Sequence, residues 1–187
     1  MKNIIFLLSL CTFLFLSCQT TSVTSSTTED GFTTIYDDVR NITFITHEDM
    51  ETGFIYNLKD SLSGERENIK LYIMDKSLVA WADYQNSDWI FINGIVFLDS
   101  EGNRLALDYG NKTDSNVNTG AIHNVYVRES YAVTIKDTDV ENLEKILNSP
   151  KIYVAFLGKK STGKMELKTK YVSAMKLTID KWKSSTK

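Results

Sequence analysis

The fold is decided by the stretch IKLYIMDKSLVAWADYQNSDWIFINGIVFLDSEGNRLALDY, residues 69–109. Four apolar runs alternate in it with three short polar segments, at residues 75–77, 85–88 and 99–103. Asp, Asn, Ser and Gly dominate these segments, and such residues favour the loops of β-hairpins. The stretch is therefore predicted to form a four-stranded antiparallel meander.

The third apolar run of this stretch, WIFINGIVFL at residues 89–98, is apolar on both faces except at Asn93 and Gly94. A strand that is apolar on both faces is typical of the centre of a covered sheet. A glycine inside a strand often marks a bulge or a bend. We expect residues 89–98 to form one central strand that is bent at Gly94.

The same period of two continues outside the meander, with turn residues at short intervals. Nine strands are expected, at residues 41–46, 53–58, 69–74, 78–84, 89–98, 104–109, 121–127, 131–135 and 152–157. Many short strands with regular turns predict a β-sandwich-like antiparallel fold.

Two segments have helical periodicity instead. Thr138 and Glu141 are spaced as a capping box, in which Thr138 would be the N-cap, and the apolar stripe that follows must end before Pro150. Residues 171–182 carry a second apolar stripe with lysines on the other side. The predicted fold is therefore mainly β with two short α-helices, one of them C-terminal.

The N-terminus has the composition of an export signal. Lys2 is followed by an apolar run at residues 4–17, which is shorter than the roughly 20 residues that a membrane-spanning helix needs. The run ends in LFLSC at residues 14–18, which resembles a bacterial lipoprotein signal in its relaxed form, with Phe15 and Leu16 where Leu and a smaller residue are usual.

This resemblance implies that residues 1–17 are removed and that Cys18 receives lipid. It covers only about the first twenty residues, and residues 31–187 resemble no characterised family. The chain has 2 cysteines, so loss of Cys11 with the signal would leave Cys18 as the single thiol, which excludes an intramolecular disulfide. The resemblance also implies an exported protein on a bacterial membrane, with the outer membrane or cell surface favoured.

Residues 19–30 are mostly Ser and Thr, which cannot bury enough apolar surface to form a core. Residues 18–30 are therefore predicted to be a flexible tether with a reach of about 40 Å. One sheet-rich domain is expected over residues 31–187. The net charge of −3, without a basic cluster, does not favour nucleic-acid binding.

Two groups of residues are candidate ligand contacts. Asp114, Asn116 and Asn118 alternate in the polar segment 110–120, which is expected to be a long loop and a recognition surface. The segment lacks the Gly and Glu of an EF-hand, so whether it binds Ca²⁺ is left open. Trp81 and Trp89 flank residues 85–88 and are placed to stack on a sugar ring.

Other motifs do not assemble into an active site. Residues 158–165 approximate a phosphate-binding loop, but Met165 replaces the required hydroxyl, and a lysine-rich hairpin loop that touches anionic lipid or polysaccharide is the alternative. His47, expected to face solvent, and His123 belong to no metal or catalytic pattern. The sequence therefore predicts no catalytic residue, metal site or cofactor.

The most consistent interpretation is a lipid-anchored envelope protein with a non-enzymatic binding domain. Its partners would be the membrane, through Cys18, and an unknown envelope protein or polysaccharide. The first alternative is a carbohydrate-binding module that recognises cell-wall or other glycans. A less favoured alternative is an uncharacterised hydrolase, for which His123 would be the residue to substitute.

Overall fold

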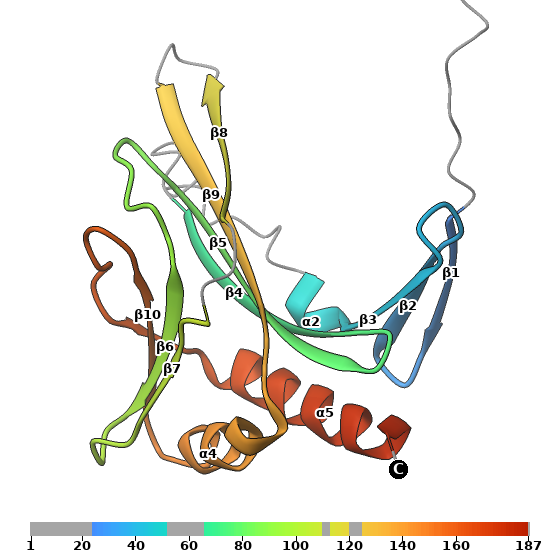
Figure 1. The fold of residues 1–187 in the computed structure, drawn as a ribbon. Coiled ribbons are helices and arrows are strands. Elements are labelled where there is room, and N and C mark those ends of the chain that lie inside the picture. The colour runs from blue at the N-terminus through green and yellow to red at the C-terminus, as the bar shows by residue number, and fades with distance from the viewer. Residues whose placement is uncertain (1–23, 52–65, 110–112, 120–124, 187) are drawn as a thin grey trace, which may run out of the picture.

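The computed structural model describes residues 24–51, 66–109, 113–119 and 125–186 (Figure 1). Within these residues the chain forms 11 strands in two antiparallel sheets, together with 3 helices. The prediction of a mainly β fold that ends in a helix is confirmed. The predicted signal, Cys18 and the predicted strand at 53–58 lie outside the described residues.

The larger sheet has seven strands in the order β1-β2-β3-β4-β5-β9-β8. Their bounds are Thr24–Glu29 (β1), Phe32–Asp37 (β2), Ile42–His47 (β3), Arg66–Met74 (β4), Ser77–Asn86 (β5), Thr113–Thr119 (β8) and Val125–Thr134 (β9). The sheet curves strongly, and β1, β2 and β3 project from the rest of the molecule as an arm (Figure 1).

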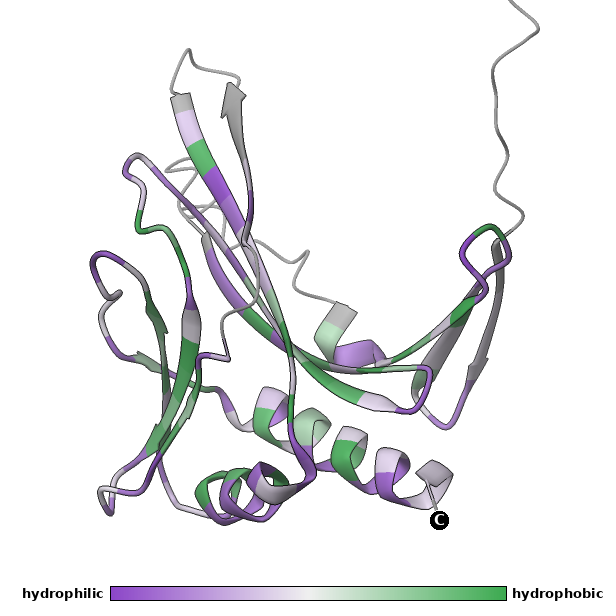
Figure 2. Cartoon of the chain, in the orientation of Figure 1, coloured by the Kyte–Doolittle hydropathy of each residue, from purple (hydrophilic) through white to green (hydrophobic). Residues whose placement is uncertain are grey.

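The smaller sheet has four strands in the order β11-β10-β6-β7. Their bounds are Gly94–Asp99 (β6), Arg104–Leu107 (β7), Ile152–Leu157 (β10) and Met165–Glu166 (β11). The pairing of β10 with β11 confirms that residues 158–164 are a hairpin loop. Strands β6 and β10 of this smaller sheet are strongly hydrophobic (Figure 2).

The helices are α2 (Glu48–Glu51), α4 (Asp137–Leu147) and α5 (Thr169–Thr186). Helix α5 packs along β3, β4 and β5, and α4 packs on β6, β7 and α5. The core lies between the sheets and these helices, and its largest fully buried side chains include Leu71, Phe97, Tyr131 and Phe156. All buried hydrophobic residues that the structure describes lie between positions 32 and 182, so a chain that begins after Cys18 retains them.

The four-stranded meander predicted for residues 69–109 is wrong in its middle. Strands β4 and β5 form one hairpin and β6 and β7 another, but the two hairpins belong to different sheets. Residues 87–93, predicted in part as strand, cross from one sheet to the other without joining a strand.

A buried carboxylate holds this crossing segment. Glu129 on β9 is 0% exposed, and its two carboxylate oxygens accept hydrogen bonds from the backbone N–H groups of Ile90, Phe91 and Ile92 at 2.7–3.1 Å. Phe91 adopts a φ of 55°, which turns the chain around the carboxylate. Backbone groups that would pair in a central strand therefore pair with a side chain instead.

The other side of the crossing segment lies against Gly158, directly after β10. A Cβ atom at this position would lie 2.1 Å from the carbonyl oxygen of Ile90, so only glycine permits the approach. The backbone N–H of Lys159 donates to the same oxygen at 2.8 Å, and that of Asn93 donates to Leu157 at 2.8 Å. The contact attaches residues 90–93 to the smaller sheet.

Three further expectations are corrected. The final part of the predicted tether, Thr24–Glu29, is strand β1, which pairs with β2 over its whole length. The predicted strands 121–127 and 131–135 correspond to one strand in the described residues, β9. Charged residues fit in the middle of this strand because Glu129 accepts hydrogen bonds from backbone N–H groups and Arg128 pairs with Asp83. Part of the predicted loop 110–120 is strand β8.

Helix α4 begins two residues earlier than the predicted capping box requires. Its N-cap is Lys136, and no side chain caps the first turn, so Thr138 is not the N-cap. Asp137 and Asp139 lie in that turn, where negative charge favours the positive end of the helix dipole. Helix α5 extends beyond the predicted residues 171–182 at both ends.

Candidate functional site

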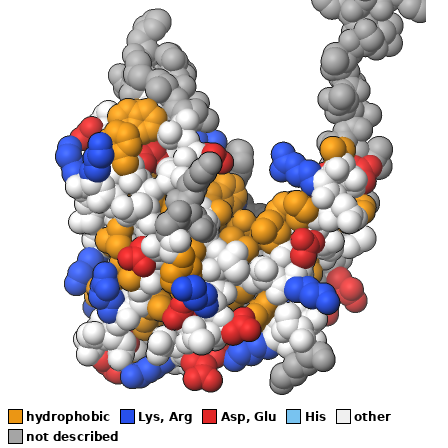
Figure 3. All heavy atoms as spheres, viewed as in Figure 1, with side chains coloured by type: hydrophobic (Ala, Val, Ile, Leu, Met, Phe, Trp, Pro, Cys, Tyr) orange, Lys and Arg blue, Asp and Glu red, His pale blue; other side chains and the backbone are white. Residues whose placement is uncertain are grey.

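The outer face of the larger sheet, opposite the core, contains a pocket of 770 Å³. Alternation along the strands explains its composition, because Ile69, Leu71 and Ile73 of β4 are buried in the core while Lys70 and Tyr72 point to the other face. Figure 3 shows a hollow with a hydrophobic floor between the arm and the rest of the molecule. The pocket is lined by Ile35, Arg40, Phe44, Thr46, Lys70, Tyr72, Trp81, Asp114, Ser115, Arg128, Ser130 and Ala132.

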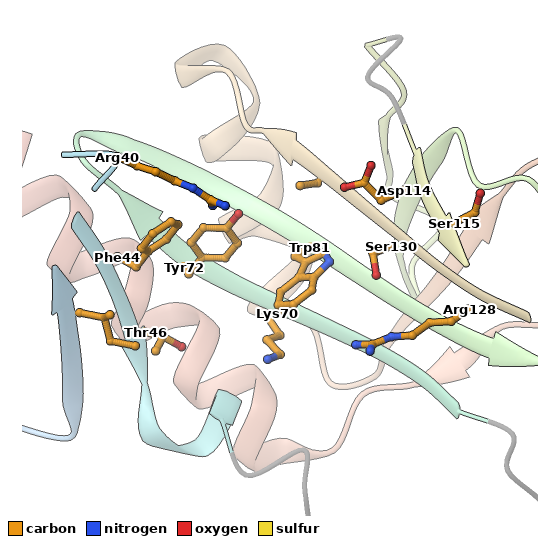
Figure 4. A pocket seen from close by; sticks show the side chains of 12 residues that line it. Arg40, Phe44, Thr46, Lys70, Tyr72, Trp81, Asp114, Ser115, Arg128 and Ser130 are labelled. Carbon is orange, nitrogen blue, oxygen red and sulfur yellow. The ribbon is translucent and has the colours of Figure 1, made fainter. Parts of the chain in front are cut away.

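Three aromatic rings from successive strands form the floor of the pocket (Figure 4). The ring centroids of Phe44 on β3 and Tyr72 on β4 are 6.1 Å apart, and those of Tyr72 and Trp81 on β5 are 6.5 Å apart, with the second pair edge to face at 80°. Trp81 pairs across the strands with Ala132, whose small side chain leaves space beside the indole. The outer face thus carries a continuous aromatic row.

Cationic side chains surround this aromatic row. The Nζ atom of Lys70 lies 4.7 Å from the ring centroid of Trp81, which is a cation–π contact. Arg128 donates from Nε and Nη2 to the two carboxylate oxygens of Asp83 at 2.8 and 3.2 Å, so its guanidinium is held in a fixed orientation. The Nε atom of Arg40 lies 3.7 Å from the Oδ2 atom of Asp37, at the end of the arm.

The lining residues carry three positive charges and one negative charge, that of Asp114. Burial raises the pKa of Tyr72 above its ordinary value of 10.0, so its hydroxyl can donate a hydrogen bond at physiological pH and beyond. Two of the cations, Arg40 and Arg128, are paired with Asp37 and Asp83, which lie outside the lining. The pocket therefore combines apolar ring surface with charged groups at its edge, which suits a ligand that has both apolar faces and polar or negative groups.

The structure brings some of the predicted contact residues together and separates others. Trp81 and Asp114 both line the pocket, although Asp114 lies on a strand rather than in the expected loop. Trp89 lies in the crossing segment, away from this pocket, where it stacks on Phe91. Asn116 and Asn118 are in β8, and the structure does not describe their side chains.

Sequence reasoning missed the other pocket residues, notably Phe44, Tyr72, Arg40 and Arg128. A signal for two of them was present, because Tyr72 and Phe44 occupy positions that alternate with core residues in their strands. Such positions are usually polar when one face of a sheet meets solvent. Their pairing in one row depends on the register of β3 with β4, which the sequence does not reveal.

Of the two histidines, His47 is the one that the structure describes. His47 was expected to face solvent but is only 7% exposed, because its ring packs edge-on against Phe32 at 5.0 Å. His123 lies outside the described residues. Among the residues that the structure describes, no cluster of His, Cys, Asp or Glu has the arrangement of a metal site.

Comparison with known proteins does not identify a relative. No protein-family model, no curated protein and no solved structure matches the chain. Across the described part of the chain, no helix is long and apolar enough to cross a membrane.

Proposed function

We propose that this chain is a binding protein whose ligand occupies the pocket on the outer face of the larger sheet. The observation that carries this proposal is the aromatic row of Phe44, Tyr72 and Trp81, which lines an open hollow instead of the core. Apolar pockets with a few charged groups are the usual form of binding sites. The ligand would be a cell-envelope component that presents apolar surface and negative charge.

We further propose that the mature chain begins at Cys18 and is attached to a bacterial membrane by lipid on that cysteine. The apolar run before Cys18 and the lack of any other cysteine after it support this proposal. Two or more acyl chains hold a protein on a membrane stably, whereas one chain gives weak attachment.

The two cysteines provide a matched test of the anchor. In cells labelled with radioactive palmitate, Cys18→Ser is expected to lose the label and to release or mislocalise the protein. Cys11→Ser should keep the label, because that residue lies in the segment that is removed. Label that persists in Cys18→Ser would refute lipid attachment at this position.

Substitutions on one sheet provide a matched test of the pocket. The chain starting at Gln19 is immobilised and exposed to envelope extract, and any captured component is identified and then titrated in purified form. Trp81→Thr should weaken this binding at least tenfold, because the indole forms the end of the aromatic row. Tyr36→Thr, which removes an aromatic ring that is 38% exposed outside the pocket, should leave it unchanged.

The second candidate function is carbohydrate binding, and it is favoured because Trp81 lines the same pocket as the polar side chains of Ser130 and Asp114. Sugars bind to proteins by stacking on aromatic rings while polar side chains bind their hydroxyl groups. Soluble cell-wall fragments should then quench tryptophan fluorescence in the wild-type chain. Quenching should disappear in Trp81→Phe and persist in Trp89→Phe, and the reverse pattern would exclude the pocket as a glycan site.

A further inference from the structure

Two loops at one end of the smaller sheet form a second distinctive surface, away from the pocket. They are the crossing segment at residues 87–93 and the loop at residues 158–164 between β10 and β11. The hydrogen bonds of Lys159 to Ile90 and of Asn93 to Leu157, each 2.8 Å, hold the two loops side by side. Figure 3 shows exposed hydrophobic atoms beside basic side chains on this part of the molecule.

Phe91 is an unusual residue for its position. Its φ of 55° lies in the left-handed region, where Gly or Asn is favoured and a bulky side chain is disfavoured. Its ring is nevertheless 50% exposed and stacks on Trp89 with a centroid distance of 5.9 Å. The hydrogen bonds to Glu129 explain the backbone turn, but they do not explain why a large apolar ring projects into solvent from it.

Lysine side chains of the second loop lie beside the first loop. The Nζ atom of Lys159 lies 4.4 Å from the ring centroid of Phe91, and Lys160 forms an ion pair with Asp88 at 2.6 Å. This pair lowers the pKa of Asp88, although both side chains are largely exposed. The two loops contain three lysines and one aspartate, so they carry a net charge of +2 in a chain whose net charge is −3.

We propose that the aromatic–lysine tip, formed by Trp89, Phe91, Lys159 and Lys160, docks on a membrane surface that contains anionic phospholipid. Aromatic rings with a polar or charged neighbour prefer the interface between acyl chains and headgroups. Lysines near such a surface are attracted by anionic headgroups, and each strengthens binding by about fivefold. The charge of the tip is thus complementary to that of an anionic bilayer.

This inference does not depend on lipid attachment at Cys18, because the tip belongs entirely to the folded domain. If both proposals hold, they reinforce each other. Strand β1 begins at Thr24, and a fully extended chain of six residues from Cys18 would reach only about 20 Å. An anchored domain would then lie against the bilayer, where a membrane-docking surface strengthens attachment.

The test uses the chain starting at Gln19, which carries no lipid, and sedimentation with vesicles. The vesicles consist either of phosphatidylcholine alone or of an equal mixture of phosphatidylcholine and phosphatidylglycerol. The wild-type chain should bind the anionic vesicles with a blue shift in the emission of Trp89 and should bind the neutral vesicles far more weakly. The double variant Lys159→Gln/Lys160→Gln should lose about 25-fold in binding to the anionic vesicles.

Phe91→Asn tests the ring without disturbing the turn, because Asn tolerates positive φ. Its thermal stability should be unchanged or higher, while vesicle binding falls about tenfold. Matched controls are Lys145→Gln/Lys151→Gln, which removes two exposed lysines elsewhere, and Leu177→Asn, which removes an apolar side chain that is 46% exposed on α5. The proposal would be overturned if the wild-type chain bound both vesicle types equally or bound neither. It would also be overturned if the tip variants and the control variants lost binding equally, or if the chain bound soluble acidic polysaccharide but not vesicles.

Discussion

The two faces of the larger sheet use aromatic and aliphatic residues for different purposes. On the inner face, Leu71 and Tyr131 are fully buried against the helices and the smaller sheet. On the outer face, Tyr72 and Trp81 line a pocket that is open to solvent and surrounded by cations. The difference shows that hydrophobicity alone does not separate residues that stabilise this fold from residues available for binding.

The comparison leads to a simple expectation. Substitutions on the closed side, which comprises the core and the junction between the sheets, should lower the free energy of unfolding. Substitutions on the open side should change binding and leave stability nearly intact.

The largest loss of stability is expected for Glu129→Leu, at the junction of the two sheets. The variant leaves three backbone N–H groups, two of them buried, without an acceptor, which should cost about 4 kcal/mol. Glu166→Leu, on the exposed strand β11, is the matched control and should cost less than about 0.5 kcal/mol. Urea denaturation measures both values, and similar costs would show that Glu129 does not hold the crossing segment.

Substitutions of neighbouring residues on β4 and β5 compare directly how much each face of the sheet contributes to stability. Leu71→Ala should cost about 3 kcal/mol, because it leaves a cavity in the core. Trp81→Thr removes a larger side chain but should cost only about 1 kcal/mol, because the indole is partly exposed on the outer face. Denaturant titration measures the free energy of unfolding of both variants. A larger loss of this free energy in Trp81→Thr than in Leu71→Ala would show that the aromatic row stabilises the fold.

Two glycines of the β10–β11 region provide the next test. Gly158→Ala should cost about 2 kcal/mol, because the new methyl group would meet the carbonyl oxygen of Ile90 at 2.1 Å. Gly163→Ala should be nearly neutral, because no atom lies within 4 Å of the added Cβ. Thermal melting compares the two variants, and equal melting temperatures would indicate that the backbones do not approach closely at Gly158.

The smallest effect is expected at Asp99, at the hairpin between β6 and β7, and it depends on pH. Burial by itself raises the pKa of Asp99, but hydrogen bonds from Asn103, Ser149 and the backbone of Glu101 outweigh it and lower the pKa from 3.8 to about 2. Because the folded-state pKa is depressed, the stabilisation is present above pH 3.8 and is lost as the pH falls towards about 2.

Asp99→Asn should therefore be less stable than the wild type at neutral pH, and this difference should shrink on acidification through the same range. Ser149→Ala removes one of the hydrogen bonds, at 2.7 Å, and should show a weaker form of the same behaviour. Unfolding is followed by circular dichroism from neutral to acidic pH. A stability difference that does not change with pH would contradict the depressed pKa of Asp99.

Much of the fold could be predicted because local patterns agree with the final structure. The hairpins on either side of residues 75–77 and 99–103 formed as expected, since Asp, Ser and Gly occur between apolar runs. The separation of β5 from β6 could not be predicted, because it depends on Glu129 and Gly158, which are distant in sequence from residues 87–93. In sequence, WIFINGIVFL is indistinguishable from one long central strand.

The candidate site was only partly predictable for the same reason. Trp81 and Asp114 were predicted as ligand contacts from their residue types and their polar neighbours in sequence, and both line the pocket. Their neighbours Phe44 and Arg128 come from strands that meet only through the pairing of β3 with β4 and of β5 with β9. Composition identifies the kinds of residue, but register decides which of them share a face.

The central claim is that the open face of the larger sheet is a binding site with aromatic and cationic character. Its most direct test is titration of the native chain starting at Gln19 with an aromatic anion, 8-anilinonaphthalene-1-sulfonate, under conditions where circular dichroism shows the fold intact. We predict saturable binding that is lost in Trp81→Thr, weakened in Arg40→Gln and retained in Tyr36→Thr. Binding that is equal in all four proteins, or absent from the wild type, would contradict the claim.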